Sequence, residues 1–172
     1  NPKRPKNEEE AAKREEYANH FYEKRKRKGV SRKEASDLMR TRTYYGTIMV
    51  DRGEADALIG GLTNKYPDTV RPALQIVGRK DDVRKVASMH IIMTKSGPLF
   101  LADTTINHHL DAEDIAGIAE LVAEQVRGFN IEPKIAMVTY SNFGSVPNGE
   151  SAVLMRDATK ILHKRYPDLI VD

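Results

Sequence analysis

The feature that most restricts how this chain can fold is a strand–loop–helix pattern. A short apolar run at Ala57–Ile59 ends in two glycines, and a polar loop follows it. Apolar residues then recur at helical spacing, at Val70, Ala73, Leu74 and Val77. An apolar run that ends in glycine and gives way to a period near 3.6 predicts a strand, a loop and then a helix.

The same pattern occurs again later in the chain. Lys134–Tyr140 has the composition of a buried strand, and the polar, glycine-containing stretch Ser141–Ser145 predicts a loop. A helix is predicted from about Gly149. Repeated strand–loop–helix units are typical of an α/β fold with a mostly parallel sheet between helices.

Other elements lie around these two units. The apolar stretches 86–94 and 98–106 are joined by a short polar turn and predict a β-hairpin, and an amphipathic helix is predicted from Asp111. Three helices are expected before the first strand, over Glu8–Lys28, Ser31–Arg40 and Tyr44–Gly53. We therefore predict a helical segment at 1–53 that leads into an α/β domain at 54–172.

Composition excludes several classes of protein. The 172 residues contain no cysteine, so neither disulfides nor a thiolate metal site is expected. The absence of cysteine predicts a cytoplasmic location. No apolar run approaches the ~20 residues that span a bilayer. The chain lacks an initial Met and ends in the apolar run Leu169–Asp172, which resembles the start of a strand, so we expect it to be a piece of a longer protein.

The basic residues are concentrated near the beginning of the chain. Residues 1–33 hold 12 Lys or Arg and 6 Glu, whereas the whole chain has a net charge of only +3. Such a segment could bind nucleic acid. Because acidic residues alternate with the basic ones and no aromatic residues are interspersed for base stacking, a solvated helix face is expected, with no nucleic-acid or membrane partner.

One residue of this basic cluster is expected to face the fold. Arg25 follows Ala18 by seven residues and Tyr22 by three, so it continues the apolar stripe of the first helix. The lysines at 24, 26 and 28 are expected to face water. A guanidinium on the buried side needs an anion, either a protein carboxylate or a ligand phosphate.

A second arginine is expected at a helix start. Thr69 or Asp68 can cap the helix after the first loop, and Pro72 suits only a first turn, which places Arg71 there. Free N–H groups and a guanidinium together would bind phosphate or carboxylate. Alternatively, Arg71 pairs with a surface carboxylate.

The loops after the two strands predict where a ligand would bind. Ligands of open α/β sheets bind at the carboxyl ends of the strands, where loops 60–68 and 141–149 would lie side by side and share a pocket with Arg25. No catalytic constellation, dinucleotide fingerprint or P-loop is present. Since adjacent histidines point in opposite directions, His108 and His109 are not expected to share a metal. Asp103 is either a ligand-side carboxylate or a turn former.

Several longer motifs resemble a known family. They are FYEKRKRKG (21–29), TYYGTIMV (43–50), ADALIG (55–60), RPALQI (71–76) and IEPKIAMV (131–138). Together they resemble the phosphate acetyl/butyryltransferases. More narrowly, YPDTVRPAL (66–74), GPLFLADTTIN (97–107) and YSNFGS (140–145) are similar to the phosphotransacetylase-like C-terminal domain of bacterial NADP-dependent malic enzymes.

The resemblance implies a fold and a ligand. The fold would be the three-layer αβα subdomain of phosphotransacetylases, similar to isocitrate and isopropylmalate dehydrogenases. The ligand would be acetyl-CoA or acetyl phosphate, held by arginines that match Arg25 and Arg71. The ligand-binding residues implied in this way, together with those of the two loops, are Arg25, Asn64, Lys65, Tyr66, Thr69, Arg71, Ser141, Asn142 and Gly144.

Two positions depart from the family pattern. Where phosphotransacetylases carry a Ser-Thr pair that holds the phosphoryl group, this chain has Lys65 and Tyr66. The loop at Ser141–Gly144 is also altered. These changes put acetyl transfer in doubt, but Lys65 adds positive charge and so leaves anion binding intact.

The resemblance therefore implies a non-catalytic domain without a metal or cofactor of its own. It would sense acetyl-CoA or acetyl phosphate and form a homodimer within an NADP-dependent malic enzyme. The parent reaction would be oxidative decarboxylation of malate to pyruvate, with NADP and Mg or Mn bound elsewhere. The alternative is a working phosphate acetyltransferase, in which arginines stabilise the charge that develops as the CoA thiol attacks acetyl phosphate.

Overall fold

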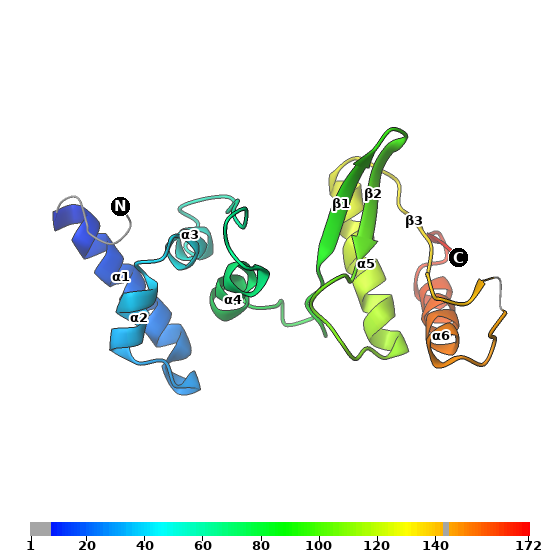
Figure 1. Cartoon of the computed structure of the whole chain (residues 1–172), viewed down its shortest axis with the longest axis horizontal. Helices are drawn as coiled ribbons and strands as arrows, with labels where there is room; N and C mark the ends of the chain where they lie inside the picture. The colour runs from blue at the N-terminus through cyan, green and yellow to red at the C-terminus, as the bar shows by residue number, and fades with distance from the viewer. Residues whose placement is uncertain (1–7, 143–144) are drawn as a thin grey trace. The chain divides into compact units, whose positions relative to one another are not determined.

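The computed structural model describes residues 8–142 and 145–172 (Figure 1). The chain divides into two compact units, Asn1–Arg79 and Lys80–Asp172. Within the described residues, no helix is long and apolar enough to span a membrane.

The N-terminal unit is helical. Its elements are α1 (Glu8–Arg25), the 3-10 turn η1 (Lys26–Lys28), α2 (Arg32–Leu38), α3 (Arg42–Asp51) and α4 (Tyr66–Ile76). The three helices predicted before residue 54 are confirmed to within a few residues. Gly29 ends the first in the left-handed conformation with φ of 89°, and the Ser31 hydroxyl caps the second by accepting from the Glu34 N–H.

Aromatic side chains form much of the core of this unit. Tyr17 and Phe21 of α1 are fully buried, and each packs against a tyrosine of α3. The ring centroids of Tyr17 and Tyr45 are 4.8 Å apart, and those of Phe21 and Tyr44 are 5.5 Å apart in an edge-to-face arrangement. This packing fixes α1 against α3.

The segment between α3 and α4 differs from the prediction. No strand forms at Ala57–Ile59, because no other described segment pairs with it. Leu58, which is 45% exposed, lies so close to α3 that a Cβ on Gly46 would be 2.8 Å from its Cδ1. Ile59 and Leu62 are almost fully exposed, at 98% and 101%.

Helix α4 begins earlier than predicted. It starts at Tyr66 after Lys65, with Pro67 in the first turn, where a missing N–H costs no hydrogen bond. Arg71 is therefore the sixth residue of the helix rather than part of its first turn, so that prediction was wrong. Pro72 lies inside the helix, where it is buried together with Ile76.

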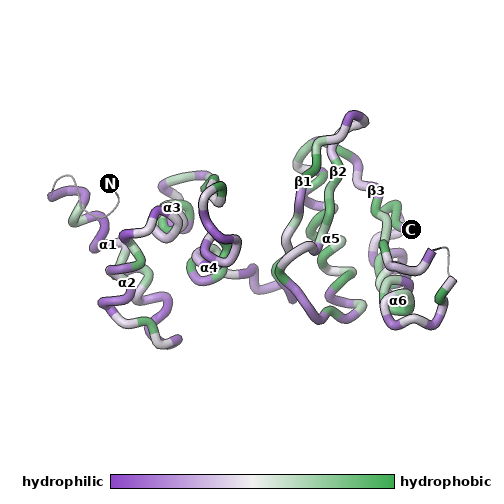
Figure 2. The backbone as a smooth tube through the Cα atoms, in the orientation of Figure 1, coloured by the Kyte–Doolittle hydropathy of each residue, from purple (hydrophilic) through white to green (hydrophobic). Residues whose placement is uncertain are grey.

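The C-terminal unit contains the strands. They are β1 (Met89–Thr94), β2 (Gly97–Ala102), β3 (Lys134–Ile135) and β4 (Ile170–Val171), and the helices are α5 (Ala112–Gly128) and α6 (Glu150–Arg165). The predicted hairpin is confirmed, since β1 and β2 pair antiparallel from Met89–Ala102 to Thr94–Gly97. Hydrophobic residues lie along this hairpin (Figure 2), and many are exposed.

Helices α5 and α6 pack together beside a short parallel pair of strands. Their core consists of small and branched apolar residues, namely Ala116, Ala119, Ala123, Leu162, Leu169 and Val171. Asp111 caps α5 through a reciprocal capping box with Asp114. The predicted strand at 134–140 is regular only at β3, although the Met137 N–H also donates to the Asp172 carbonyl at 2.6 Å. The predicted α/β class, with parallel pairing and one hairpin, is confirmed. The predicted boundary at residue 54 stays a prediction.

Candidate functional site

The loop before α4 places polar groups at the start of that helix. Asn64 and Lys65 are exposed, and the Lys65 carbonyl accepts from the N–H groups of Asp68 and Thr69 at 3.0 and 3.3 Å. Tyr66 is 44% exposed. The hydroxyl oxygen of Thr69 is buried and makes no hydrogen bond with any described residue. Its hydrogen-bonding capacity is thus unused in the part of the chain that the structure describes.

Among the described residues, Arg71 pairs with the carboxylate of Asp68. Its Nη1 lies 3.8 Å from Asp68 Oδ1, one turn earlier on the exposed side of α4. Both side chains are more than half exposed, so the pair contributes little to stability and leaves the guanidinium available.

Arg25 lies at the end of α1 and is partly buried, as predicted from the apolar stripe. Its Nε is buried and has no hydrogen-bond partner within residues 8–142 and 145–172. A buried donor without an acceptor is costly, and a bound anion would remove that cost.

Tyr44 brings the two arginines into one electrostatic environment. Burial raises the pKa of its phenol, and the positive charges of Arg71 and Arg25 both oppose that rise. The hydroxyl donates to Gln75 Oε1 at 2.6 Å. The carboxylates of Glu34 and Asp68 act on the same phenol in the opposite direction, so charges of both signs surround Tyr44.

Tyr44 is not among the ligand-binding residues predicted from the sequence. Its side chain is buried, at 7% exposure, and its ring packs against Phe21 of α1. Its position in the TYYGTIMV motif could have indicated a polar contact. A tyrosine on a buried helix face needs a hydrogen-bond partner for its hydroxyl.

Two of the predicted loop residues lie in the C-terminal unit. The Ser141 hydroxyl accepts from the Val146 N–H at 3.0 Å, and the Asn142 carbonyl accepts from the Ser145 N–H at 2.9 Å. Both groups are therefore used within their own loop. Gly144 lies outside the described residues, and the pocket that these loops were expected to share stays a prediction.

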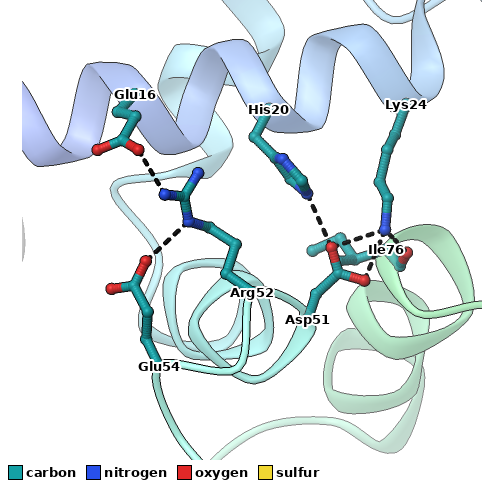
Figure 3. Close-up of polar contacts among 7 residues, drawn as sticks. All are labelled: Glu16, His20, Lys24, Asp51, Arg52, Glu54 and Ile76. Carbon is teal, nitrogen blue, oxygen red and sulfur yellow. Dashed lines mark hydrogen bonds and ion pairs between the residues drawn. The ribbon is translucent and has the colours of Figure 1, made fainter.

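A polar cluster beside the core of the N-terminal unit corrects one expectation (Figure 3). Lys24 does not simply face water, because its ammonium donates to Asp51 and to the Ile76 carbonyl. His20 also contacts Asp51, at 2.8 Å. Burial alone would raise the pKa of Asp51, but hydrogen bonds from Lys24 and His20 outweigh it and the pKa is lowered. The spacing of apolar residues did not predict this contact, because the long Lys24 side chain extends to Asp51 and Ile76 from the edge of the apolar stripe.

In the same figure, Arg52 bridges Glu16 and Glu54. Glu54 also accepts from Lys13 and from the Tyr17 hydroxyl. Hydrogen bonds from Lys13, Tyr17 and Arg52 lower the pKa of Glu54 to about 2. This second cluster joins α1 to the end of α3, so its charges are used in holding the helices together.

Asp103 is a turn former in the C-terminal unit. Its carboxylate accepts four hydrogen bonds, two from Ser88 and two from Asn107. This arrangement satisfies the side chain within the protein and decides between the two roles that the sequence left open.

The side chains described above are mainly cationic, which is the chemistry that suits an anion. Arg25 offers an unused buried donor, Arg71 is exposed, and Lys65 adds charge at the start of α4. No group of three or more His, Asp or Glu residues suited to a metal occurs among the residues that the structure describes.

Known structures with the same fold define the class of this chain. A phosphotransacetylase from Streptococcus pyogenes superposes with a TM-score of 0.77 at 33% identity, covering 92% of this chain and 48% of that one. EutD phosphotransacetylase from Staphylococcus aureus superposes with a TM-score of 0.74 at 29% identity, covering 97% and 50%. The chain therefore has the fold of about half of a phosphotransacetylase.

The family follows from the sequence. The model of the Phosphate acetyl/butaryl transferase family matches residues 4–172, and the chain belongs to this family. The resemblance read from the motifs is thus confirmed at the level of the family.

Malic enzymes and phosphate acetyltransferases are both among the curated relatives. The chain is 39% identical to an NADP-dependent malic enzyme of Salmonella typhimurium over 158 residues, which are 91% of this chain and 21% of that protein. It is 35% identical to a phosphate acetyltransferase of Nitratidesulfovibrio vulgaris over 92% of this chain and 22% of that protein. The chain thus spans about a fifth of the length of both relatives.

Proposed function

We propose that this domain binds acetyl phosphate or acetyl-CoA and regulates an NADP-dependent malic enzyme. The observation that supports an anionic ligand is the buried Nε of Arg25, which has no acceptor among the described residues. Arg71 contributes a second guanidinium that acts on Tyr44 together with Arg25. A phosphate oxygen is the acceptor that guanidinium groups bind most effectively.

Lys65 and Tyr66 favour a regulatory role over catalysis. A phosphotransacetylase with a Ser-Thr pair at these positions holds the phosphoryl group with two compact hydroxyls. Here Lys65 is exposed and its side chain does not cap α4. A long flexible cation attracts an anion but does not fix its orientation for attack by a thiol.

The parent enzyme is part of the same proposal. It would oxidatively decarboxylate malate to pyruvate in the cytoplasm, with NADP and Mg or Mn bound outside these residues. Support comes from the similarity to NADP-dependent malic enzymes of Salmonella typhimurium and Escherichia coli, at 39% and 38% identity.

Self-association through the hairpin is also proposed. Apolar side chains on both strands are exposed, including Ile91 at 43%, Met93 at 77% and Leu99 at 50%. A hairpin with exposed apolar faces and open edges requires a covering surface, and a second copy related by a two-fold axis would supply one.

The alternative is an active phosphate acetyltransferase. It is favoured by identities of 35% and 38% to the phosphate acetyltransferases of Nitratidesulfovibrio vulgaris and Synechocystis sp.. In that case the two arginines would stabilise charge that develops on the phosphoryl group during transfer.

Calorimetry with the full-length protein tests the anion site. Arg25→Ala and Arg71→Ala should each remove a charge-assisted contact worth about 1.5 to 3 kcal/mol, which lowers affinity for acetyl phosphate roughly ten- to a hundredfold. Arg27→Ala, in the exposed turn η1, is the matched control and should bind as the wild type does. Equal and negligible effects of all three substitutions would show that these arginines are structural.

A further inference from the structure

The cluster in Figure 3 joins three helices at one ammonium group. The Nζ of Lys24 donates to both carboxylate oxygens of Asp51 at 2.5 and 2.6 Å, and to the Ile76 carbonyl oxygen at 2.9 Å. Lys24 belongs to α1, whereas Asp51 and Ile76 are the last residues of α3 and α4. Since a lysine has three donors, all of them are used in connecting these helices.

Both acceptors need this cation. The Asp51 side chain is only 12% exposed, and a carboxylate at that depth is costly unless it is paired. The Ile76 carbonyl lies at the carboxyl end of α4, where carbonyls lack partners within the helix and the helix dipole is negative. His20 gives Asp51 a further contact at 2.8 Å, and of these two side chains Lys24 is the one with a described hydrogen bond to α4.

The hydrogen bond from Lys24 to the Ile76 carbonyl joins two residues that lie near the proposed anion site in the sequence. Lys24 directly precedes Arg25, and Ile76 directly follows Gln75, which accepts the Tyr44 hydroxyl. Arg71 lies between one and two turns earlier on the same helix. A displacement of α4 along or away from α1 would therefore change the separation between the two guanidinium groups.

We propose that Lys24 is a positioning residue for the anion site. It holds α4 against α1, and in this way it sets the distance between the Arg25 and Arg71 guanidinium groups. The inference rests on the proposed function, because it assigns Lys24 a role at that same site. Two donors on different helices bind one small anion tightly only if their separation is fixed before binding.

The chain offers a matched control for this role. Lys26 is two residues further on, and its ammonium pairs with Glu23, three residues earlier in the chain. Replacing Lys26 removes the same charge and side chain without touching the contacts that Lys24 makes with α3 and α4. Lys24→Arg, in contrast, keeps the charge and hydrogen-bond donors near Asp51 and Ile76.

The test measures helix position without ligand and affinity with acetyl phosphate, both in the full-length protein. Spin labels are attached at Glu15 of α1 and Leu74 of α4, whose side chains are exposed. We expect Lys24→Met to broaden or shift the distance distribution between the labels, and to lower affinity for acetyl phosphate about tenfold. Lys26→Met should change neither quantity, and Lys24→Arg should restore most of both.

The outcomes separate this inference from the proposed function. An unchanged distance distribution in Lys24→Met would overturn the positioning role, whatever the arginines do. Unchanged affinity in Lys24→Met, with large losses in Arg25→Ala and Arg71→Ala, would also overturn it and leave the site intact. A changed distribution, with normal binding by both arginine variants, would uphold the placement of α4 by Lys24 but refute the anion site.

Discussion

Asp103 makes stability depend on pH in a way that can be measured. Its Oδ1 accepts from the Ser88 N–H and hydroxyl at 2.8 and 2.6 Å, and its Oδ2 accepts from the Asn107 N–H and amide at 2.9 and 2.6 Å. Burial raises the pKa of this carboxyl, but the hydrogen bonds from Ser88 and Asn107 prevail and lower it from 3.8 to about 2.

The size of the effect follows from this difference. Each unit of pKa corresponds to about 1.36 kcal/mol, so a fall from 3.8 to about 2 gives at most about 2.4 kcal/mol. Because Asp103 is partly exposed, we reduce this to about 1 to 2 kcal/mol. The pKa is lowered in the folded state, so this stability is present above pH 4 and is lost as the pH falls toward 2, with about half gone by pH 3.

Asp103→Asn tests the reasoning. The substitution keeps the size of the side chain, but it removes the charge and turns an amide donor toward the donors of Asn107 or Ser88. Urea unfolding at pH 7 should show a loss of about 1 to 2 kcal/mol, and the difference from the wild type should shrink between pH 5 and pH 3. Asp157→Asn, on the exposed side of α6, is the control and should change stability little.

A particular result would refute this account. If Asp103→Asn unfolds at the same urea concentration as the wild type at pH 7, the four hydrogen bonds contribute no net stability. If the variant is less stable by an amount that does not vary between pH 7 and pH 3, the loss comes from packing rather than from the ionised carboxylate.

Two further predictions concern activity and assembly. Because Lys65 and Tyr66 occupy the phosphoryl-holding positions, the full-length protein should transfer acetyl groups from acetyl phosphate to CoA slowly, and a turnover of about 10 per second or more in a coupled assay would contradict this. The protein should be a dimer by light scattering at micromolar concentration, and Met93→Asp should shift it toward monomer whereas Lys95→Ala, in the hairpin turn, should not. A wild-type protein that is entirely monomeric would argue against association through the hairpin.

Local signals in the sequence predicted much of the fold. The α5 helix and its Asp111 cap followed from apolar spacing and a capping residue, and both are present. The hairpin followed from two apolar stretches around Lys95–Gly97. These elements are defined by residues close together in the chain, so their signals are strong.

The errors arose where distant or competing interactions decide the structure. Ala57–Ile59 has the composition of a strand but has no described partner to pair with, and a strand requires one. Pro72 suggested a helix start, whereas Pro67 provides one five residues earlier. Pro72 lies inside the helix, where burial of its ring offsets part of the cost of the missing N–H.

The candidate site was predicted only in part. The inward direction of Arg25 followed from the stripe on α1, because periodicity determines which face a residue occupies. Tyr44 as the side chain affected by both arginines, and Lys24 as the contact to α4, could not be predicted. Both depend on how three helices pack, and spacing along one helix does not specify that packing.

The contact between Gly46 and Leu58 has a consequence for how this sequence can evolve. A methyl group at position 46 would lie 2.8 Å from the Leu58 Cδ1 atom, although alanine is otherwise the better residue inside a helix. Because Cδ1 is the far end of a flexible side chain that is 45% exposed, Leu58 can move aside and alanine at 46 costs little, whereas a larger residue at 46 requires a smaller or displaced residue at 58. Across related sequences, alanine should therefore occur at position 46 beside leucine at 58, whereas a larger residue at 46 should be accompanied by a smaller one at 58.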